Sequence, residues 1–202
     1  MLDLRIDPAL AEELAALGRF ADRCGWVPAT SGNLSCRIDA ERILVTRSGV
    51  HKGELTPGDF VVVPLDGPLP AGVSAETPLH RLRYRNDRSV GAVLHVHSVA
   101  ATVLSRLCRS DGAVELHGFE MHKSLDGVTT HDSSVRIPIF ANDQDTVALA
   151  EAVERGLSPG VPGYLLAGHG LYAWGASTDL ARRHLEGLEF LLRCALEERR
   201  FR

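Results

Sequence analysis

Residues 93–98 read Val93-Leu94-His95-Val96-His97-Ser98, and this segment is the most informative one about the fold. Its apolar residues predict a buried strand over residues 92–97, and the apolar stretch Val99–Leu107 that follows predicts a helix. Side chains two residues apart on a strand point to the same face, so His95 and His97 would share one side. Two imidazoles in that arrangement can bind one metal ion, although a surface strand whose exposed face carries histidine gives the same pattern.

A zinc site needs a further protein ligand, and His169 is the best candidate among the remaining histidines. It lies between Gly168 and Gly170, where two strand-like stretches meet and glycine allows a close approach of the backbone. Three histidine ligands would leave a fourth coordination position open, which is the arrangement of catalytic zinc sites. An ordinary turn histidine is the alternative interpretation of His169.

Two other histidines are expected to have different roles. His184 falls within the predicted last helix, beside Arg183, and we expect it to be solvated. His80 falls on a helix predicted to follow Pro78, and we expect a structural role for it rather than metal ligation.

The rest of the chain alternates between strand-like and helix-like stretches. Asp7 and Pro8 predict the start of a helix that ends near Gly25, because aspartate caps helices and proline fits their first position. A second helix is predicted near Glu76, with Thr77 as its cap. This order predicts one α/β domain over residues 1–202, with helices on both faces of a mixed, mainly antiparallel sheet. Further strands are predicted at residues 34–38, 43–46, 60–65, 114–116, 137–140, 164–167 and 171–174, and further helices at 146–155 and from 177 or 178 to 199.

The composition excludes several classes of protein. Hydrophobic residues make up 45% and charged residues 24% of the 202 residues, which suits a globular domain and excludes a disordered or collagen-like chain. The net charge of −4, without a basic run, argues against a nucleic-acid partner. There is no apolar run of the ~18 residues that a membrane helix needs, and no secretory signal is recognisable. Four cysteines without a paired motif predict reduced thiols and a cytoplasmic location.

Three loops combine hydroxyl side chains with glycine, a composition that favours an anion-binding site for a phosphate group. Ordinary turns use the same residues, so each loop alone is weak evidence. Lys52, one of only two lysines, closely follows the second loop and could neutralise the anion. The candidate phosphate-binding residues are Thr30, Gly32, Asn33, Ser48, Gly49, Lys52 and Ser74.

Two carboxylates are candidates for general acid/base catalysis. Glu76 lies at a predicted junction between a loop and a helix. Glu120 lies between Phe119 and Met121, and these apolar neighbours could raise its pKa by desolvation. Either residue could instead be a carboxylate that stabilises the start of a helix, and their positions in the sequence do not choose between them.

Taken together and in order, four motifs make the chain resemble the class II aldolase/adducin family over nearly its whole length. The resemblance implies an αβα three-layer sandwich and a phosphorylated ketose as substrate. It also implies one Zn²⁺ per subunit on His95, His97 and His169, in a homotetramer whose active sites lie between subunits. The four motifs are Ser31-Gly32-Asn33-Leu34-Ser35, Thr46-Arg47-Ser48-Gly49, His95-Val96-His97-Ser98 and Gly168-His169-Gly170.

Within the family, residues 119–121, 140–145 and 169–175 resemble the branch whose members remove water from the ketose phosphate. That resemblance implies that Glu120 is the catalytic acid/base, whereas in the aldolase branch the carboxylate at the position of Glu76 has this role. The alternatives are a sugar-phosphate aldolase or a pentulose-phosphate 4-epimerase, and more remotely a non-catalytic scaffold. Aldolases and epimerases typically use a tyrosine beyond the last helix, but the last tyrosine here is Tyr172. A scaffold would have no need of the three histidines.

Overall fold

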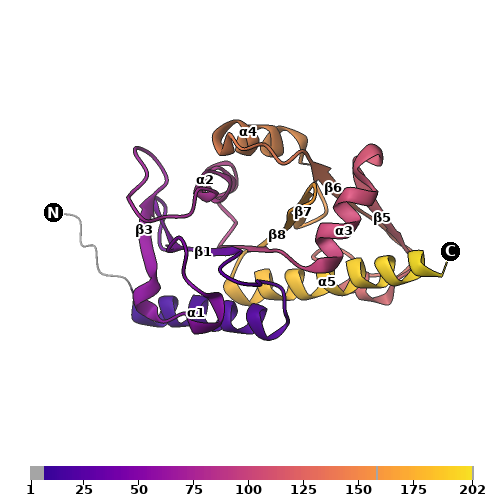
Figure 1. Ribbon diagram of the computed structural model, residues 1–202, viewed down its shortest axis with the longest axis horizontal. Helices are drawn as coiled ribbons and strands as arrows, with labels where there is room; N and C mark the ends of the chain where they lie inside the picture. The colour runs from indigo at the N-terminus through magenta and orange to yellow at the C-terminus, as the bar shows by residue number, and fades with distance from the viewer. Residues whose placement is uncertain (1–6, 158, 202) are drawn as a thin grey trace.

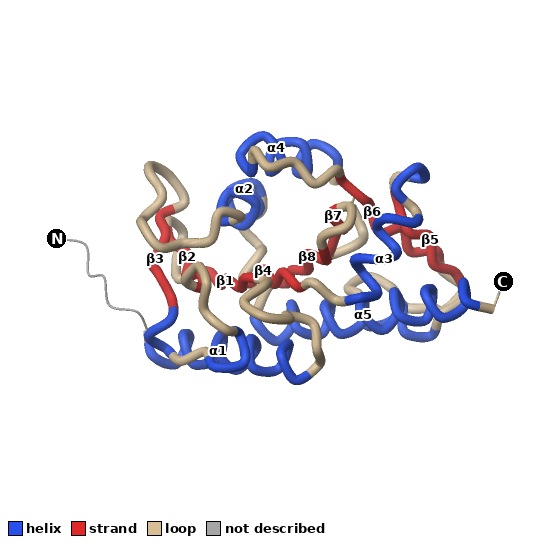
Figure 2. The backbone as a smooth tube through the Cα atoms, in the orientation of Figure 1, coloured by secondary structure: helices blue, strands red, loops and turns tan. Residues whose placement is uncertain are grey.

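The computed structural model describes residues 7–157 and 159–201, and its centre is an eight-stranded sheet in the order β3-β2-β1-β4-β8-β7-β6-β5. Figures 1 and 2 show this sheet running through the middle of the molecule. The strands are β1 (Asn33–Arg37), β2 (Arg42–Thr46), β3 (Phe60–Pro64), β4 (Ala92–Val96), β5 (Ala113–His117), β6 (Ser134–Phe140), β7 (Gly163–Leu166) and β8 (Gly170–Gly175).

The strand β4, which carries the first histidine of the His-Val-His motif, lies between β1 and β8. It runs antiparallel to both, with His95 opposite Asn33 on one side and opposite Tyr172 on the other. Among the described strands, β6 and β7 form the one parallel pair. The prediction of a mixed, mainly antiparallel sheet is therefore confirmed, and the pairing brings two segments that are distant in sequence, β1 and β8, to His95.

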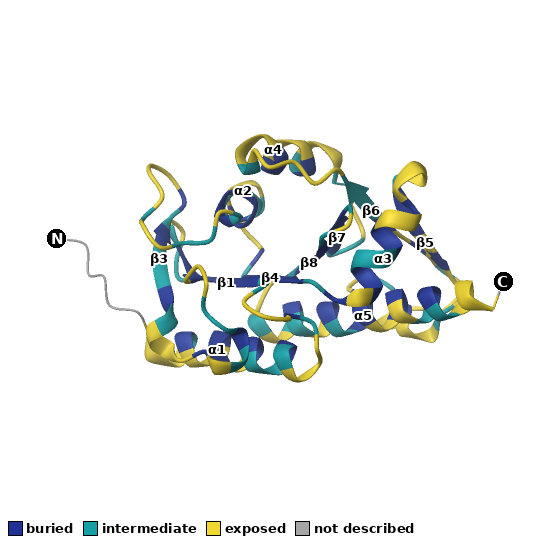
Figure 3. Cartoon of the chain, viewed as in Figure 1, coloured by how far each residue is buried: buried dark blue, intermediate teal, exposed yellow. Residues whose placement is uncertain are grey.

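Helices cover both faces of the sheet, so the predicted three-layer arrangement is also confirmed (Figures 1 and 2). One face packs against three helices and the other against two, and each face has its own apolar core. Figure 3 shows the buried residues concentrated on the sides of the helices that face the sheet. The first group is α1 (Pro8–Arg23), α3 (Val99–Leu107) and α5 (Thr178–Arg200), and the second is α2 (Thr77–Asn86) and α4 (Thr146–Gly156).

The helix ends follow the capping residues closely. The Asp7 carboxylate accepts a hydrogen bond from the Ala9 N–H at the start of α1, and the Ser177 hydroxyl accepts one from the Leu180 N–H at the start of α5. The start of α2 differs by one residue from the prediction. Glu76 occupies the cap position and Thr77 is already helical, because the Thr77 hydroxyl donates to the Ser74 carbonyl oxygen in the preceding loop.

The expectation that His184 is solvated is wrong. Its side chain is 2% exposed, because α5 lies along the sheet and position 184 belongs to the face that packs against it. The His184 Nδ1–H donates to the Trp174 carbonyl oxygen, and its Nε2 accepts from the Asp126 N–H. Among the described residues, no helix is long and apolar enough to cross a membrane.

Candidate metal centre

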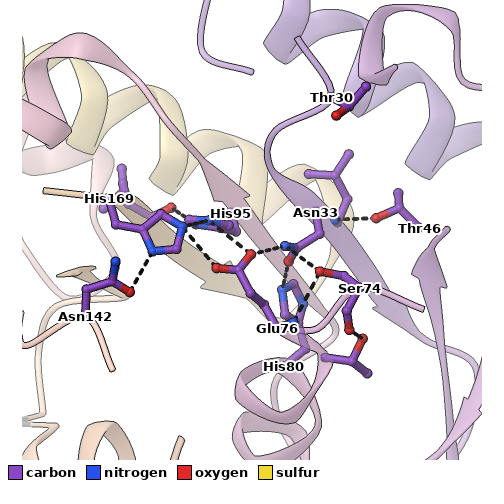
Figure 4. A network of polar contacts seen from close by, with 12 residues as sticks. Thr30, Asn33, Thr46, Ser74, Glu76, His80, His95, Asn142 and His169 are labelled. Atoms are coloured by element: carbon purple, nitrogen blue, oxygen red, sulfur yellow. Dashed lines mark hydrogen bonds and ion pairs between the residues drawn. The ribbon is translucent and has the colours of Figure 1, made fainter. Parts of the chain in front are cut away.

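Three histidines and one glutamate converge where β4 ends and β8 begins. Their ligand atoms all lie within 4.8 Å of one another, although they come from distant parts of the fold. Glu76 caps α2, His95 lies on β4, His97 directly follows β4, and His169 lies in the turn before β8. Figure 4 shows Glu76 pointing toward His95 and His169. The structure therefore brings together all three histidines predicted as metal ligands, together with one of the two candidate carboxylates.

The distances within this cluster suit a shared ion. The Nε2 atoms of His95 and His169 are 3.3 Å apart, and the Glu76 carboxylate lies 3.0 Å from His169 Nε2 and 3.5 Å from His95 Nε2. The ring of His97 is 4.6 Å, between centroids, from each of the other two imidazoles. His95 is fully buried, and the other three side chains are partly buried.

Contacts behind two of the rings determine which nitrogen faces the centre. The Nδ1 of His95 lies 3.0 Å from the Leu171 carbonyl oxygen, and the Nδ1 of His169 lies 3.1 Å from the amide oxygen of Asn142. Both of these partners can only accept, so each Nδ1 carries a hydrogen, and each ring in its neutral form presents the lone pair of Nε2. Two lone pairs and a carboxylate facing one another hold no shared proton, and this donor set fits a bound cation.

The electrostatics of the cluster favour the same protonation states. Burial lowers the pKa of His95 well below its usual value and that of His97 to about 4, so both imidazoles are neutral at pH 7. Burial alone would raise the pKa of Glu76. The nearby rings of His95 and His169 and a hydrogen bond from Asn33 outweigh that effect, and the pKa of Glu76 falls well below its usual value. Neutral His95 and His97 and an ionised Glu76 are the forms of these side chains that bind metal ions.

A cavity of about 410 Å³ opens next to the cluster. Its walls include His97, His169 and all three of the loops in which hydroxyl side chains and glycine had been noted. The structure thus brings the seven candidate phosphate-binding residues to one cavity, namely Thr30, Gly32, Asn33, Ser48, Gly49, Lys52 and Ser74.

Lys52 lies in this cavity wall, but its amine is buried and already has hydrogen-bond partners. It is only 1% exposed, and its Nζ donates to the carbonyl oxygens of Thr30 and Val50 at 2.8 Å each. Burial lowers the pKa of its ammonium group. Lys52 therefore ties two of the loops together, and the exposed cation in the cavity wall is Arg47, which the sequence had not singled out as a ligand.

Glu120, the other candidate carboxylate, is not part of this cluster. It begins the short 3-10 helix η4 (Glu120–Ser124), which packs against α5, where Arg183 donates to the Lys123 carbonyl oxygen. Its side chain is 71% exposed and accepts from Lys123 Nζ at 2.6 Å. The expected rise in its pKa is wrong for the single chain, because the hydrogen bond from Lys123 lowers the pKa.

Asn142 and the backbone around position 170 complete the site, and neither had been predicted. Asn142 lies within a stretch already noted for its family resemblance, but only the fold places its amide on His169. Gly170 has no room for a side chain, because a Cβ there would lie 2.0 Å from the Val96 carbonyl oxygen. This close approach sets the turn that carries His169 against the end of β4.

With fold and site in view, comparison with known proteins identifies the class. The family described as the Class II Aldolase and Adducin N-terminal domain matches residues 12–196, and the chain belongs to this family. The resemblance inferred from the four motifs is confirmed. Among solved structures, the l-fuculose-1-phosphate aldolase from Thermus thermophilus has a TM-score of 0.80 and 29% identity, covering 96% of each chain.

More similar in sequence are relatives named methylthioribulose-1-phosphate dehydratase. The relative from Bradyrhizobium sp. (strain BTAi1 / ATCC BAA-1182) is 50% identical, covering 96% of this chain and 94% of its own length. The relative from Marinobacter nauticus (strain ATCC 700491 / DSM 11845 / VT8) is 46% identical, and the match covers both chains completely. These identities extend over all or nearly all of each chain.

Proposed function

We propose that this chain is a cytoplasmic methylthioribulose-1-phosphate dehydratase of the methionine salvage pathway. The reaction converts 5-methylthioribulose 1-phosphate into 2,3-diketo-5-methylthiopentyl 1-phosphate and water. The observation that carries the proposal is that the cluster of His95, His97, His169 and Glu76 adjoins a cavity lined by hydroxyl groups and glycines. Relatives of that name, about half identical over nearly the whole chain, support the choice of substrate.

The donor set supports Zn²⁺ as the metal, with His95, His97 and His169 as its ligands. Three imidazole nitrogens are a common catalytic zinc site, with Zn–N distances of about 2.0–2.1 Å. A Zn²⁺ ion bound there would supply a Lewis acid that polarises the oxygens at C2 and C3 of the ketose and acidifies the C3 proton. Asn142 and the Leu171 carbonyl oxygen orient two of the ligands from behind.

The loops around the cavity hold the 1-phosphate in this proposal. Hydroxyl groups of Thr30, Ser48 and Ser74, and backbone N–H groups near Gly32 and Gly49, can donate to its oxygens. The Asn33 amide lies between this cavity and Glu76. Lys52 contributes by holding the loops in register and by adding positive charge.

Two carboxylates carry the protons. Glu76 is ionised and lies within the cluster, so it can accept the proton from C3. A second proton must reach the C4 hydroxyl so that it leaves as water, and the resulting enol then becomes the diketone. We assign that step to Glu120, brought to the site by a neighbouring subunit of a homotetramer, because Glu120 is exposed and lies away from the cluster of its own chain.

Aldol cleavage of a ketose 1-phosphate is the second candidate function, and 4-epimerisation is related to it. The position of Glu76 inside the cluster favours this candidate, because the aldolase branch places its acid/base carboxylate there. A non-catalytic scaffold is disfavoured, because nothing in such a role would require neutral histidines converging on a carboxylate.

The decisive experiment incubates the zinc-loaded protein with 5-methylthioribulose 1-phosphate and follows the diketone product. Diketone should form, stop forming after chelation and return with Zn²⁺. A His117→Ala variant, which changes an exposed histidine on β5, is the matched control and should behave like the parent. Cleavage of ketose 1-phosphates by a metal-replete sample that forms no diketone would move the assignment to the aldolases.

A further inference from the structure

Glu76 and four polar side chains behind it line one seam between α2 and β1. Glu76, His80 and Tyr84 are four residues apart, which places them on one face of the helix. Asn33 and Ser35 are two residues apart, which places them on one face of the strand. The two periodicities meet along this seam, and it leads from the core of the protein to the cluster.

These five side chains form one continuous chain of contacts. The Tyr84 hydroxyl lies 2.9 Å from Ser35 Oγ, and Ser35 Oγ lies 2.7 Å from His80 Nδ1. The Nε2 of His80 contacts the amide oxygen of Asn33, and Asn33 Nδ2 lies 2.5 Å from a Glu76 oxygen. Figure 4 shows the last part of this chain, from His80 through Asn33 to Glu76.

The ionised carboxylate of Glu76 fixes the direction of every hydrogen bond in this series. An ionised Glu76 can only accept, so the Asn33 amide must turn its NH₂ toward Glu76 and its oxygen toward His80. That oxygen can only accept, so the hydrogen of His80 lies on Nε2 and its Nδ1 accepts from Ser35. Tyr84 in turn donates to Ser35. Each donor therefore points toward the cluster, and bonds aligned in this way strengthen one another.

Burial makes this arrangement rigid. The residues Ser35, His80 and Tyr84 are fully buried, so none of them can exchange its partner for water. Burial also lowers the pKa of His80 to about 4, and the imidazole remains neutral at pH 7 with a single N–H. The ring of His80 packs edge-on against Tyr172, which stacks on His95 at 3.9 Å between centroids. These ring contacts keep the His80 imidazole in place, and its hydrogen bond to Asn33 leads to the cluster.

We propose that His80 is a positioning residue: its Nε2–H orients the Asn33 amide, which then holds Glu76 against the metal centre. This inference rests on the proposed function only in that the turnover assays use the proposed reaction. His80 itself touches neither the cluster nor the cavity. Its effect passes through Asn33, so removing the Nε2 donor should free the amide to rotate and let Glu76 leave its place.

Two substitutions at position 80 separate positioning from packing. In His80→Gln, the amide nitrogen reaches the place of Nε2 and can still donate to Asn33. In His80→Asn, the shorter amide can replace only Nδ1, so it keeps the contact with Ser35 and loses Asn33. We expect His80→Asn to lower kcat by about 10- to 100-fold with little change in KM. His80→Gln should stay within about threefold of the parent kcat, because it keeps the bond that positions Asn33.

A double-mutant cycle tests whether the effect passes through Asn33. Adding His80→Asn to an Asn33→Ala background should cost almost nothing further, because the link is already broken. Full additivity of the two effects, or equal losses in His80→Asn and His80→Gln, would overturn the proposal. Melting curves and metal content of each variant identify any loss that arises from unfolding.

A measurement on the parent protein keeps the inference testable without turnover. Nitrogen-15 spectra of labelled histidine distinguish the two neutral tautomers, and we expect His80 to be neutral with its hydrogen on Nε2 across pH 6 to 8. A hydrogen on Nδ1 would reverse the direction of the hydrogen bonds that His80 makes and would overturn the proposal, even if His80→Asn fails to fold. Failure of the parent to form the diketone would instead contradict the proposed function and leave this tautomer test standing.

Discussion

Gly170 lies so close to Val96 that a Cβ at position 170 would be 2.0 Å from the Val96 carbonyl oxygen. This contact joins the start of β8 to the end of β4, and the two strands carry or adjoin all three histidines of the cluster. The geometry of the metal centre therefore depends on a residue that has no side chain.

Replacing Gly170 with alanine should separate these two strand ends. We expect Gly170→Ala to lose bound metal and to reduce the free energy of unfolding by about 1–3 kcal/mol, as overpacking does. Metal analysis and urea unfolding measure the two effects. Gly58→Ala is the matched control, because the nearest atom to its new Cβ, Thr56 Oγ1, would be 3.7 Å away. Normal metal content in Gly170→Ala would contradict the argument.

Removing one imidazole should empty the metal centre while the fold remains. His169 is partly exposed and lies in a turn, so we expect His169→Ala to fold normally and to lose stoichiometric zinc and turnover. Elemental analysis of the purified protein measures the zinc. The exposed His117 provides the control variant, His117→Ala, which should retain its metal. Equal zinc content in the two variants would show that His169 is not a ligand.

Variants of Glu120 and Glu76 should differ in whether a second inactive variant restores their activity in mixed oligomers. We expect Glu120→Gln to keep zinc and to lose turnover by about 100-fold or more, the usual size of an acid/base contribution. If a neighbouring subunit supplies Glu120, mixed oligomers of Glu120→Gln and His169→Ala chains should recover activity, since some sites then receive all intact groups. Recovery in mixtures of Glu76→Gln and His169→Ala should be absent, because both groups belong to one chain. An unchanged rate in Glu120→Gln would remove it from the mechanism.

Arg47 should contribute to binding of the phosphate rather than to chemistry. It is the exposed cation in the cavity wall, whereas the amine of Lys52 is occupied by two carbonyl oxygens. We expect Arg47→Ala to raise KM about tenfold with kcat nearly unchanged, as loss of a charge-assisted hydrogen bond would do. Inhibition by inorganic phosphate should weaken in parallel. Arg88→Ala, at an exposed arginine outside the cavity, should leave both constants unchanged, and an equal KM in both variants would exclude Arg47 as a ligand.

Glu189 on α5 should make stability depend on pH. Burial raises the pKa of this carboxyl group from 4.5 to about 7, and a hydrogen bond with Ser98 only partly offsets the rise. The folded protein therefore binds more protons than the unfolded chain between these two values, so the free energy of unfolding falls as pH rises through this range. At ~1.4 kcal/mol per pKa unit, the loss is about 3 kcal/mol.

Glu189→Gln should remove that part of the pH dependence, because an amide stays neutral. Urea unfolding of parent and variant at about pH 5 and pH 8 measures the difference. We expect the variant to gain stability relative to the parent at the higher pH, where the parent must bury a charge. A parent and variant with parallel pH profiles would contradict a raised pKa at Glu189.

Local patterns were enough to predict the layers of this fold and half of its site. Strand and helix periodicities extend over a few residues, so most elements could be predicted from their own segments within one or two residues, whereas β6 begins three residues before its predicted start. The pair His95 and His97 is of the same kind, because the strand period alone puts both on one side. The hydroxyl- and glycine-containing loops were likewise recognisable by composition, although not the cavity they form.

Contacts between distant segments could not be predicted in this way. His184 was misplaced because its burial depends on which face of α5 meets the sheet, and the sequence could not show that the Lys52 amine bonds to the Thr30 carbonyl oxygen of another loop. The choice of Glu76 as the carboxylate inside the cluster depended on the docking of α2 beside β1. The contact between Asn142 and His169 depends on the pairing of β6 with β7, which the sequence alone does not show.

The sequence by itself thus determined the elements, the family and the histidines that could bind a metal. The tertiary structure alone decided which side chains meet, which nitrogen of the His95 and His169 rings faces the centre and which carboxylate belongs to the cluster. The physical reason is range: backbone periodicity acts between neighbours in the chain, whereas hydrogen bonds and burial act between any groups that folding brings within a few ångströms.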